Sequence, residues 1–528
     1  MIYRVILDPD EDGYLGPHLL KAGEHLSRWP HVVFFRACMA LYEYNRDDRI
    51  IHALCRHYLN ERADNFAWRD MNNVEIILWL YGVTGEKKLL KYAKEIYRKY
   101  NDRHGSDSID DVSLSEKKPT EHGVSHNEYM KQGAILYSYT KDQKYLEVSK
   151  SAFRKMEKFF MLPGGCICSN EHMIDNKYYE TYETCDISDM TWSLSYLYRI
   201  TSDASYGDKI ERCIFNAGLG SVSDDFRSLQ YFSGANQVTL GYSSNNNDRG
   251  ITSDWMRYAP NPGTACCPGN VNRFMPNYIF NMWQNDNNTL KSCLFGPSQL
   301  HVKFDSGKAF ISEETSYPFE DSVRYVIKTD TPFTLSLRVP SFAISMTVRG
   351  IKYDISALHG ESFINCEIVG DETLNVEFEY SIEEKVSEPG VYLCRGPLVY
   401  SLPIEKVSET VFDKTSGEHY PSYNLYPKSE WRYALIGDYS YHRPSSLDSA
   451  WKPGLPRISA KAKKILNLAP DKNDPKYKKG GRKYSYSDYT FTPKLKRTSD
   501  LRLADNEETI DLLPYGFSKL RMTVFNKI

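Results

Sequence analysis

The sequence predicts a helical domain built as an α/α toroid, followed by antiparallel β-sandwich domains. A degenerate motif recurs between helically spaced segments in the first 290 residues, and after about residue 291 the hydrophobic period changes from 3.6 to 2. The length of 528 residues fits two to four domains. We expect an α/α barrel at 1–290, a β-sandwich at 291–400, and a C-terminal β region with a Lys/Pro-rich loop at 401–528.

The recurring motif is a Leu-Tyr pair followed by Thr or Asn and then by Asp or Glu. Its copies begin at Leu41, Leu80, Leu136 and Leu197. The polar residues are typical of a turn and of the N-cap or first turn of the next helix, so each copy predicts a helix–turn–helix hairpin. The copies lie 39, 56 and 61 residues apart, which is too irregular for a uniform solenoid. A closed ring of hairpins, with the active site in its central hole, is therefore expected.

Strand patterns dominate the second half of the chain. Apolar residues alternate with polar ones at 333–339 and 374–380, as in half-buried strands. A Pro- and Lys-rich stretch at about 450–497 interrupts this pattern, and its most basic part, 461–497, is interpreted as a solvated loop.

Composition excludes several functional classes. The net charge of −3 gives no support to nucleic-acid binding, and no apolar run is long enough to span a membrane. The first residues do not form a secretion signal, so a cytoplasmic location is expected for the chain as written. In a reducing compartment the eleven cysteines would stay free for metal binding or chemistry. The sequence does not indicate an oligomeric state.

Cys266 and Cys267 form the most informative local feature. Adjacent cysteines are uncommon, and a vicinal disulfide would form a strained ring. Two neighbouring thiolates can both reach one Zn²⁺ ion, whereas two free cysteines can also simply fill a core. The pair alone leaves both interpretations open.

A second segment offers further ligands. Glu183 and Cys185 stand two residues apart, which in an extended segment places them on the same side. Together with Cys266 and Cys267 they could complete a tetrahedral zinc site. Cys166 and Cys168 form a competing thiol pair. The remaining cysteines are interpreted as core residues: Cys38, Cys55, Cys213, Cys293, Cys366 and Cys394.

Acidic and imidazole side chains complete the set of candidates. Glu171 follows a flexible Gly-Gly pair, and glycoside cleavage generally needs a protonated carboxyl group, although a loop glutamate can equally be only solvated. His122 and His126 have the spacing of two metal ligands on one helix face. Because the chain contains no His-Glu-x-x-His order, we interpret His122 as a hydrogen-bonding group in a pocket.

These motifs resemble glycoside hydrolase family 127 and its relatives, which include bacterial β-L-arabinofuranosidases. The specific part is Tyr182-Glu183-Thr184-Cys185 followed by Cys266-Cys267-Pro268-Gly269-Asn270, and the similarity runs through most of the chain. Supporting segments are His122-Gly123-Val124, Glu211-Arg212 with Asn216, Tyr231-Phe232, Asn236-Gln237, Arg395 to Tyr400, and Pro514-Tyr515-Gly516.

The resemblance implies a catalytic (α/α)6 barrel with β-sandwich domains and a retaining glycosidase that releases L-arabinofuranose-type sugars from an oligosaccharide or glycoconjugate. It implies that Zn²⁺ is bound by four residues: Glu183, Cys185, Cys266 and Cys267. It also implies that Cys266 is the nucleophile and Glu171 the general acid/base. His122 and Tyr231 are implied to bind the substrate. The exact sugar and linkage stay open.

One departure and two alternatives accompany this expectation. Family members usually carry a substantial segment before the stretch that is Asp12-Gly13-Tyr14-Leu15 here, so an N-terminally shortened toroid is expected, and a secretion signal could have been lost with that segment. The first alternative is a carbohydrate lyase or epimerase on the same toroid, which would not need the cysteines. The second is a non-catalytic carbohydrate-binding protein with a structural zinc ion.

Overall fold

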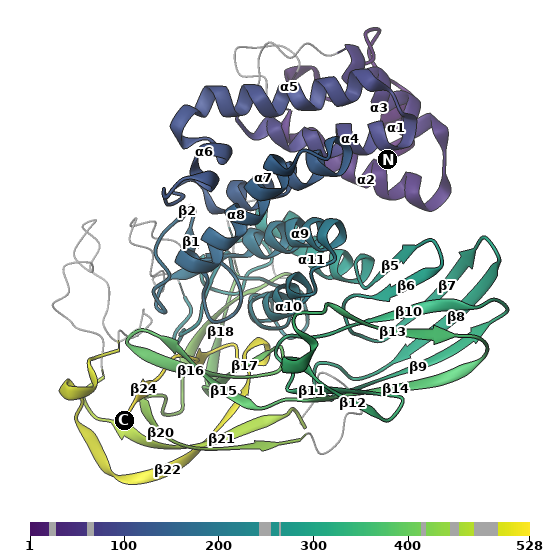
Figure 1. Ribbon diagram of the computed structural model, residues 1–528. Helices are drawn as coiled ribbons and strands as arrows, with labels where there is room; N and C mark the ends of the chain where they lie inside the picture. Colours follow the sequence, from purple (N-terminus) through teal and green to yellow (C-terminus); the bar gives the residue numbers. More distant parts are fainter. Residues whose placement is uncertain are drawn as a thin grey trace. The chain divides into compact units, whose positions relative to one another are not determined.

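The computed structural model describes residues 1–20, 28–60, 68–241, 255–262, 266–412, 419–443, 454–468 and 495–528. Two compact units divide the chain, Met1–Phe159 and Phe160–Ile528. In Figure 1 the helices of the first unit are drawn in purple and blue, and most strands of the second unit are drawn in green and yellow. No helix among the described residues has the length and apolarity that a membrane crossing requires.

The first unit is helical. Within it α2 packs against α4 and α4 against α7, while α3 contacts α2, α4 and α5. Its described helices are α1 (Ile2–Ile6), η1 (His18–Leu20), α2 (Trp29–Asn45), α3 (Asp48–Asn60), η2 (Trp68–Asn72), α4 (Asn73–Thr84), α5 (Lys87–His104), η3 (Gly105–Asp107), α6 (Ile109–Leu114), α7 (Gly123–Thr140) and α8 (Gln143–Phe160).

The four predicted helix–turn–helix hairpins are confirmed. They are α2/α3, α4/α5 and α7/α8, and in the second unit α9 (Thr184–Thr201) with α10 (Ser205–Arg212). In α7/α8, Lys141 adopts a left-handed conformation that ends the first helix. Thr140 Oγ1 accepts a hydrogen bond from Asp142 N at 3.3 Å, and Asp142 Oδ1 accepts one from Lys144 N at 3.0 Å. The spacing that the four copies share thus encodes a turn and a helix cap.

The second unit begins with a smaller group of helices and short strands. α9 packs against both α10 and α11. The elements before the larger sheets are β1 (Ser169–Asn170), β2 (His172–Met173), β3 (Thr181–Glu183), α9, α10, the π-helix η4 (Cys213–Gly218), β4 (Phe232–Gly234) and α11 (Cys266–Phe280).

Three larger sheets follow, whose strand orders are β13-β10-β6-β5, β12-β11-β14-β9-β8-β7 and β15-β16-β17-β22-β21-β20-β24, with β23 paired to β17. The first two sheets touch through stacked rings of Phe304 and Phe333, 5.2 Å apart. The strands of these two sheets are β5 (Trp283–Asp286), β6 (Thr289–Ser292), β7 (Ser298–Phe304), β8 (Gly307–Glu314), β9 (Ser322–Thr329), β10 (Phe333–Arg338), β11 (Ser345–Val348), β12 (Ile351–Asp354), β13 (Phe363–Ile368) and β14 (Glu372–Glu379).

The third sheet and a separate β18-β19 pair complete the unit. Their strands are β15 (Ile382–Ser387), β16 (Gly390–Arg395), β17 (Leu398–Pro403), β18 (Lys406–Val411), β19 (Ser422–Pro427), β20 (Tyr433–His442), β21 (Arg457–Ile465), β22 (Leu503–Pro514), β23 (Arg521–Met522) and β24 (Asn526–Lys527). The remaining described 3-10 turns are η5 (Ile355–Leu358), η7 (Thr498–Asp500) and η8 (Tyr515–Phe517).

The structure corrects two details of the predicted β region. Not every strand pair is antiparallel, because β10 pairs with β6, and β20 with β24, in parallel; each pair joins strands that are distant in the chain. The Lys/Pro-rich stretch is not wholly a loop, since β21 lies inside it and alternates buried Ile458, Ala460 and Ala462 with more exposed residues. Its remainder at 469–494 lies outside the described residues. The domain boundaries stay predictions.

Candidate functional site

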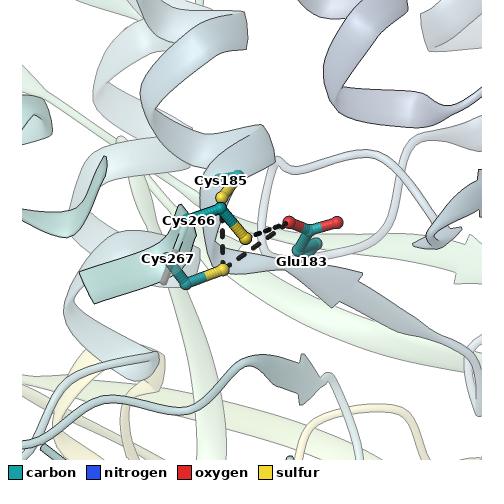
Figure 2. A group of neighbouring side chains, drawn as sticks. All are labelled: Glu183, Cys185, Cys266 and Cys267. Atoms are coloured by element: carbon teal, nitrogen blue, oxygen red, sulfur yellow. Dashed lines mark hydrogen bonds between the residues drawn. The ribbon is translucent and has the colours of Figure 1, made fainter. Parts of the chain in front are cut away.

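Four side chains from two distant segments meet in the second unit. Glu183 ends β3, Cys185 lies in the first turn of α9, and Cys266 and Cys267 begin α11. One ligand atom from each of the four lies within 4.8 Å of every other. Figure 2 shows the thiols of Cys266 and Cys267 pointing toward the Glu183 carboxylate. We call these four residues the Glu–Cys cluster; the sequence-predicted pairing of the two segments is confirmed.

The contacts inside the Glu–Cys cluster are close. The thiols of Cys266 and Cys267 donate hydrogen bonds to Glu183 Oε1 at 3.8 and 3.6 Å. The sulfur atoms of Cys185 and Cys267 lie 3.2 Å apart. Glu183, Cys185 and Cys267 are buried, whereas Cys266 is partly exposed, so Cys266 is the member that a molecule from solvent could reach.

One local expectation about this cluster is wrong. Glu183 and Cys185 do not share an extended segment, because the strand ends at Glu183 and Cys185 is already helical. Glu183 is the N-cap of α9, and its backbone N–H donates to Asp186 Oδ2 at 3.3 Å. This capping interaction starts the helix directly after the strand, and the turn between them brings the carboxylate and the thiol together.

The Glu–Cys cluster lies at the N-termini of two packed helices. α9 and α11 contribute their first turns, and the partial positive charge of a helix N-terminus favours thiolate and carboxylate groups. Two links hold the helix starts together: the ion pair of Arg273 with Asp189, and a 2.7 Å hydrogen bond from Ser188 Oγ to the carbonyl of Asn270. The two helix N-termini therefore stabilise the anionic forms of the side chains in the Glu–Cys cluster.

Burial opposes charge on most of this cluster. Desolvation raises the pKa values of Glu183, Cys185 and Cys267. Hydrogen bonds from the thiols of Cys185 and Cys267 lower the pKa of Cys266. Burial therefore disfavours several negative charges in the cluster when no cation is present.

A divalent cation would remove this conflict, and the residues present fit one. Among the described residues no lysine or arginine forms an ion pair with any member of the Glu–Cys cluster. Glu183 Oε2 is buried and has no hydrogen-bond partner, which leaves a lone pair available for a ligand bond. Three sulfur ligands and one carboxylate oxygen are donors that suit Zn²⁺.

Tyr231 joins the candidate acid to the candidate nucleophile. Its hydroxyl donates a hydrogen bond to Glu171 Oε1, and Cys266 Sγ lies 3.7 Å from the same hydroxyl oxygen. Tyr231 is buried and directly precedes β4, where its carbonyl accepts a 3.0 Å hydrogen bond from Thr184 N. The ring of Trp255 packs on it with centroids 4.4 Å apart. The sequence indicated that Tyr231 lines a cleft, but no sequence signal indicated that Tyr231 connects Glu171 with Cys266.

Glu171 lies at the tip of a tight hairpin rather than in an irregular loop. It connects β1 and β2, where Asn170 pairs with His172, and it adopts a positive φ of 68°. A left-handed conformation is uncommon for a residue other than glycine, asparagine or aspartate and is concentrated at functional sites. The hairpin fixes the direction in which the Glu171 carboxyl group points.

The candidate histidine belongs to the first unit. His122 is the N-cap of α7, and its Nδ1 accepts a hydrogen bond from Ser125 N at 3.3 Å. His126 is fully buried and its Nδ1 lies 2.6 Å from Glu121 Oε1. No metal-ligand group among the described residues contains both histidines. The substrate-binding role of His122 stays a prediction.

The competing cysteines do not join the cluster. Cys166 and Cys168 are fully buried, and burial raises the pKa of both thiols. Of the cysteines interpreted as core residues, Cys55 is partly exposed and five are buried: Cys38, Cys213, Cys293, Cys366 and Cys394.

A network from the C-terminal end of the chain supports the ribbon of β3 and β4. Gly234 O accepts hydrogen bonds from Arg521 Nε at 3.1 Å and from Tyr515 OH at 3.0 Å. Ser233 Oγ accepts from Tyr182 OH and from Arg521 Nη2, at 3.0 and 2.9 Å. Arg521 is fully buried. Because Glu183 ends β3 and Tyr231 precedes β4, this network fixes the backbone behind both side chains. Tyr182 and Tyr515 had been noted from the sequence only as members of motifs, and Arg521 had not been noted at all.

Known proteins share this sequence pattern and fold. Residues 39–279 match the profile "Beta-L-arabinofuranosidase, GH127 catalytic domain", and residues 289–382 match the corresponding middle domain. A non-reducing end β-L-arabinofuranosidase from Bifidobacterium longum subsp. longum is 23% identical over 240 residues, which are 41% of this chain and 35% of that protein. The chain thus matches only about a third of this curated relative's length.

Solved structures resemble the whole chain. A GH127 β-L-arabinofuranosidase from Geobacillus stearothermophilus T6 aligns with a TM-score of 0.71 at 17% identity, covering 100% of this chain and 86% of that one. A second GH127 β-arabinofuranosidase aligns with a TM-score of 0.70 at 17% identity, covering 100% and 83%. These likenesses establish the fold, and the consecutive profile matches establish the relationship. The chain belongs to glycoside hydrolase family 127.

Proposed function

We propose that this protein is a retaining glycosidase that releases L-arabinofuranose-type sugars through the thiolate of a zinc-bound Cys266. The observation that carries the proposal is the meeting of Glu183, Cys185, Cys266 and Cys267 within 4.8 Å, beside a tyrosine that contacts Glu171. The named activities of the similar proteins support the choice of sugar. The helix hairpins are proposed to form an (α/α)6 toroid, and the first two larger sheets a β-sandwich.

Zn²⁺ held by these four residues would keep the thiols it binds deprotonated at neutral pH, where a free thiol with a pKa of about 8.5 is mostly protonated. In the first step Cys266 Sγ attacks the anomeric carbon, and the bond from that carbon to the leaving oxygen breaks. Glu171 gives its proton to the leaving oxygen. The products are a thioglycoside on Cys266, a released alcohol and an ionised Glu171.

In the second step the Glu171 carboxylate removes a proton from a water molecule. The water oxygen attacks the anomeric carbon, the bond to sulfur breaks, and the thiolate of Cys266 and the protonated acid are regenerated. Two displacements at one carbon retain the anomeric configuration.

The spacing of acid and nucleophile agrees with this order of events. Glu171 and Cys266 both contact the hydroxyl of Tyr231, so they are separated by no more than two short contacts. Retaining glycosidases place their two reacting groups about 5–5.5 Å apart, whereas inverting enzymes need room for a water molecule between them. Tyr231 can also donate its hydrogen bond to whichever of the two groups is charged. His122 is proposed to bind hydroxyl groups of the substrate.

A structural zinc ion in a carbohydrate-binding protein is the second candidate. Four protein ligands fill a tetrahedron, and closed sites of this kind are typical of structural zinc. The partial exposure of Cys266 and its contact with Tyr231 favour catalysis instead, because a purely structural ligand needs neither.

The test combines metal analysis of the purified protein with hydrolysis of nitrophenyl L-arabinofuranosides of both anomers. We expect one zinc ion per chain and cleavage of the β anomer, with proton NMR showing the β configuration in the sugar first released. Zinc without cleavage of any nitrophenyl glycoside would favour the structural role, and release of the α-configured sugar would contradict the double displacement.

A further inference from the structure

An open groove of about 980 Å³ lies at the hairpin of β7 and β8 and contains no member of the Glu–Cys cluster. It is lined by residues of both strands, 301–310, by 328–330 at the end of β9, and by Asp371. A volume of this size is ample for an oligosaccharide unit. The groove uses no residue of the proposed active site.

An aromatic pair forms part of this groove. His301 of β7 and Phe310 of β8 face each other across the strand pair, and their ring centroids lie 4.8 Å apart at an interplanar angle of 45°. His301 is exposed and Phe310 is partly exposed. Rings with exposed faces provide apolar area against which the C–H face of a pyranose can pack.

Three lysines surround the aromatic pair. Lys303 and Lys308 stand directly opposite each other on β7 and β8, and Lys328 of β9 stands opposite Phe310. All three are exposed, and none forms an ion pair with a described carboxylate. Like charges directly opposite each other in a strand pair are destabilising, so this arrangement costs stability unless an anion is bound between them.

The groove also contains aspartates, and two of them are engaged by backbone groups. Asp330 Oδ1 accepts a hydrogen bond from Lys308 N at 2.7 Å, and Asp371 Oδ1 accepts one from Thr329 N at 2.8 Å. Asp305 lies in the turn that follows β7. The carboxylates of Asp330 and Asp371 therefore secure strand ends, while the ammonium groups of the three lysines pair with no described carboxylate and remain available to a ligand.

We propose that this groove binds a uronate-bearing oligosaccharide, with sugar rings packing on His301 and Phe310 and carboxylates bound by Lys303, Lys308 and Lys328. That the anion is carried by a sugar rests on the proposed function, since a glycosidase meets its substrate as part of a glycan. The groove would hold the acidic part of that glycan while the active site acts elsewhere on it.

The test is calorimetric titration of the zinc-loaded full chain with trigalacturonate and, separately, with its fully methyl-esterified form. We expect the acid to bind at least tenfold more tightly than the ester, with an affinity that falls as salt is added. The double variant Lys303→Gln/Lys308→Gln should lose about tenfold in affinity for the acid, and Phe310→Ala should weaken both ligands. Lys406→Gln, an exposed lysine of β18, is the matched control and should bind as the wild type does.

Three results would overturn the proposal: equal binding of acid and ester, unchanged binding by the double variant, or citrate binding as tightly as trigalacturonate. A lower melting temperature of the ligand-free double variant would also contradict it, because removal of two facing charges without a ligand should not destabilise the strand pair. Hydrolysis of nitrophenyl arabinofuranosides by the double variant should equal that of the wild type. If the wild-type protein itself does not hydrolyse these arabinofuranosides, the proposed active site is refuted. The titrations with trigalacturonate and its ester would still decide whether the groove binds uronates.

Discussion

Two buried clusters of acidic side chains in the second unit differ in how their negative charge is compensated. Asp208 and Glu211 of α10 both contact the guanidinium of Arg338 from β10, and all three are buried; we call them the Arg338 cluster. The Glu–Cys cluster gathers four acidic groups, and no described lysine or arginine pairs with them. A cation supplied by the chain is permanent, whereas a cation taken from solution can be removed.

The locations of the two clusters explain this difference. The Arg338 cluster joins a helix to a sheet and has no partly exposed member. The Glu–Cys cluster lies at two helix starts, and one of its thiols is partly exposed. An ion pair needs both partners to stay in place, so it suits a structural joint. A metal–thiolate site can combine charge compensation with a reactive group that a substrate reaches.

The largest expected effect comes from the partly exposed thiol. Cys266→Ser should lower kcat/KM on a nitrophenyl arabinofuranoside by at least about 10³-fold, because the hydroxyl of serine is a far weaker nucleophile than a thiolate. Cys55→Ser changes a partly exposed cysteine outside the cluster and serves as the control, with activity within about twofold of the wild type. Steady-state kinetics measure both. Near-normal turnover by Cys266→Ser would remove Cys266 from the mechanism.

Removing the permanent cation should damage stability rather than chemistry. Arg338→Met leaves Asp208 and Glu211 buried without their partner, which costs about 3–5 kcal/mol of unfolding free energy. Denaturant unfolding measures the loss, and it should be the same with or without added zinc. A variant as stable as the wild type would show that Arg338 does not compensate these carboxylates.

Removing the exchangeable cation should affect both stability and activity. A strong chelator should abolish turnover and lower the unfolding free energy by about 3–4 kcal/mol, the linkage expected for a metal present at 100 to 1,000 times its dissociation constant. Added zinc should restore both quantities. Thermal unfolding and activity followed in parallel test this, and full activity in metal-free protein would contradict the proposed role of the cluster.

The two clusters also differ in how far the sequence could predict them. Adjacent Cys266 and Cys267 form a rare pattern with a direct chemical meaning, and the Leu-Tyr motif encodes its own turn, so both were predictable. The pairing in the Arg338 cluster gave no signal: Glu211 belongs to a recognised motif, but Arg338 and Asp208 are 130 residues apart and look like ordinary charged residues. Local patterns report on local structure, whereas pairing across the fold depends on packing that no single segment encodes.

The same reason explains what was missed near the active site. The bridge from Tyr231 to Glu171 spans 60 residues, and the support of Gly234 by Arg521 spans 287. The helical position of Cys185 was missed because the signal that starts α9 is an acid, Glu183, which was already interpreted as a metal ligand. A residue with two roles is easily assigned only one of them.

A smaller effect is expected from the hydroxyl that connects acid and nucleophile. Tyr231→Phe removes the hydrogen bond to Glu171 and the contact with Cys266 while keeping the ring against Trp255. One hydrogen bond to a charged group corresponds to about tenfold in rate, and kcat should fall by that factor with little change in KM. Zinc content should stay unchanged. A rise in KM alone would mean that Tyr231 binds substrate and does not assist the reaction.

The smallest effect concerns an acid that is neutralised by a proton rather than a cation. Burial raises the pKa of Glu313 from an ordinary value of 4.5 to about 8, against hydrogen bonds from Ser298 Oγ at 2.9 Å and from Gly296 N at 3.3 Å. Since the folded protein holds this proton more tightly than the unfolded chain does, its contribution to stability is complete below about pH 4.5 and is lost as the pH rises through 8.

Glu313→Gln keeps the shape of the side chain and removes its titration. The melting temperature of the variant relative to the wild type should therefore rise between pH 5 and pH 9, with the variant equal or slightly less stable at pH 5. Thermal unfolding at both pH values, in matched zinc and salt, gives this difference directly. A difference independent of pH would mean that Glu313 is ionised in the folded protein, and that a cation in its surroundings compensates it as Arg338 does for Asp208 and Glu211.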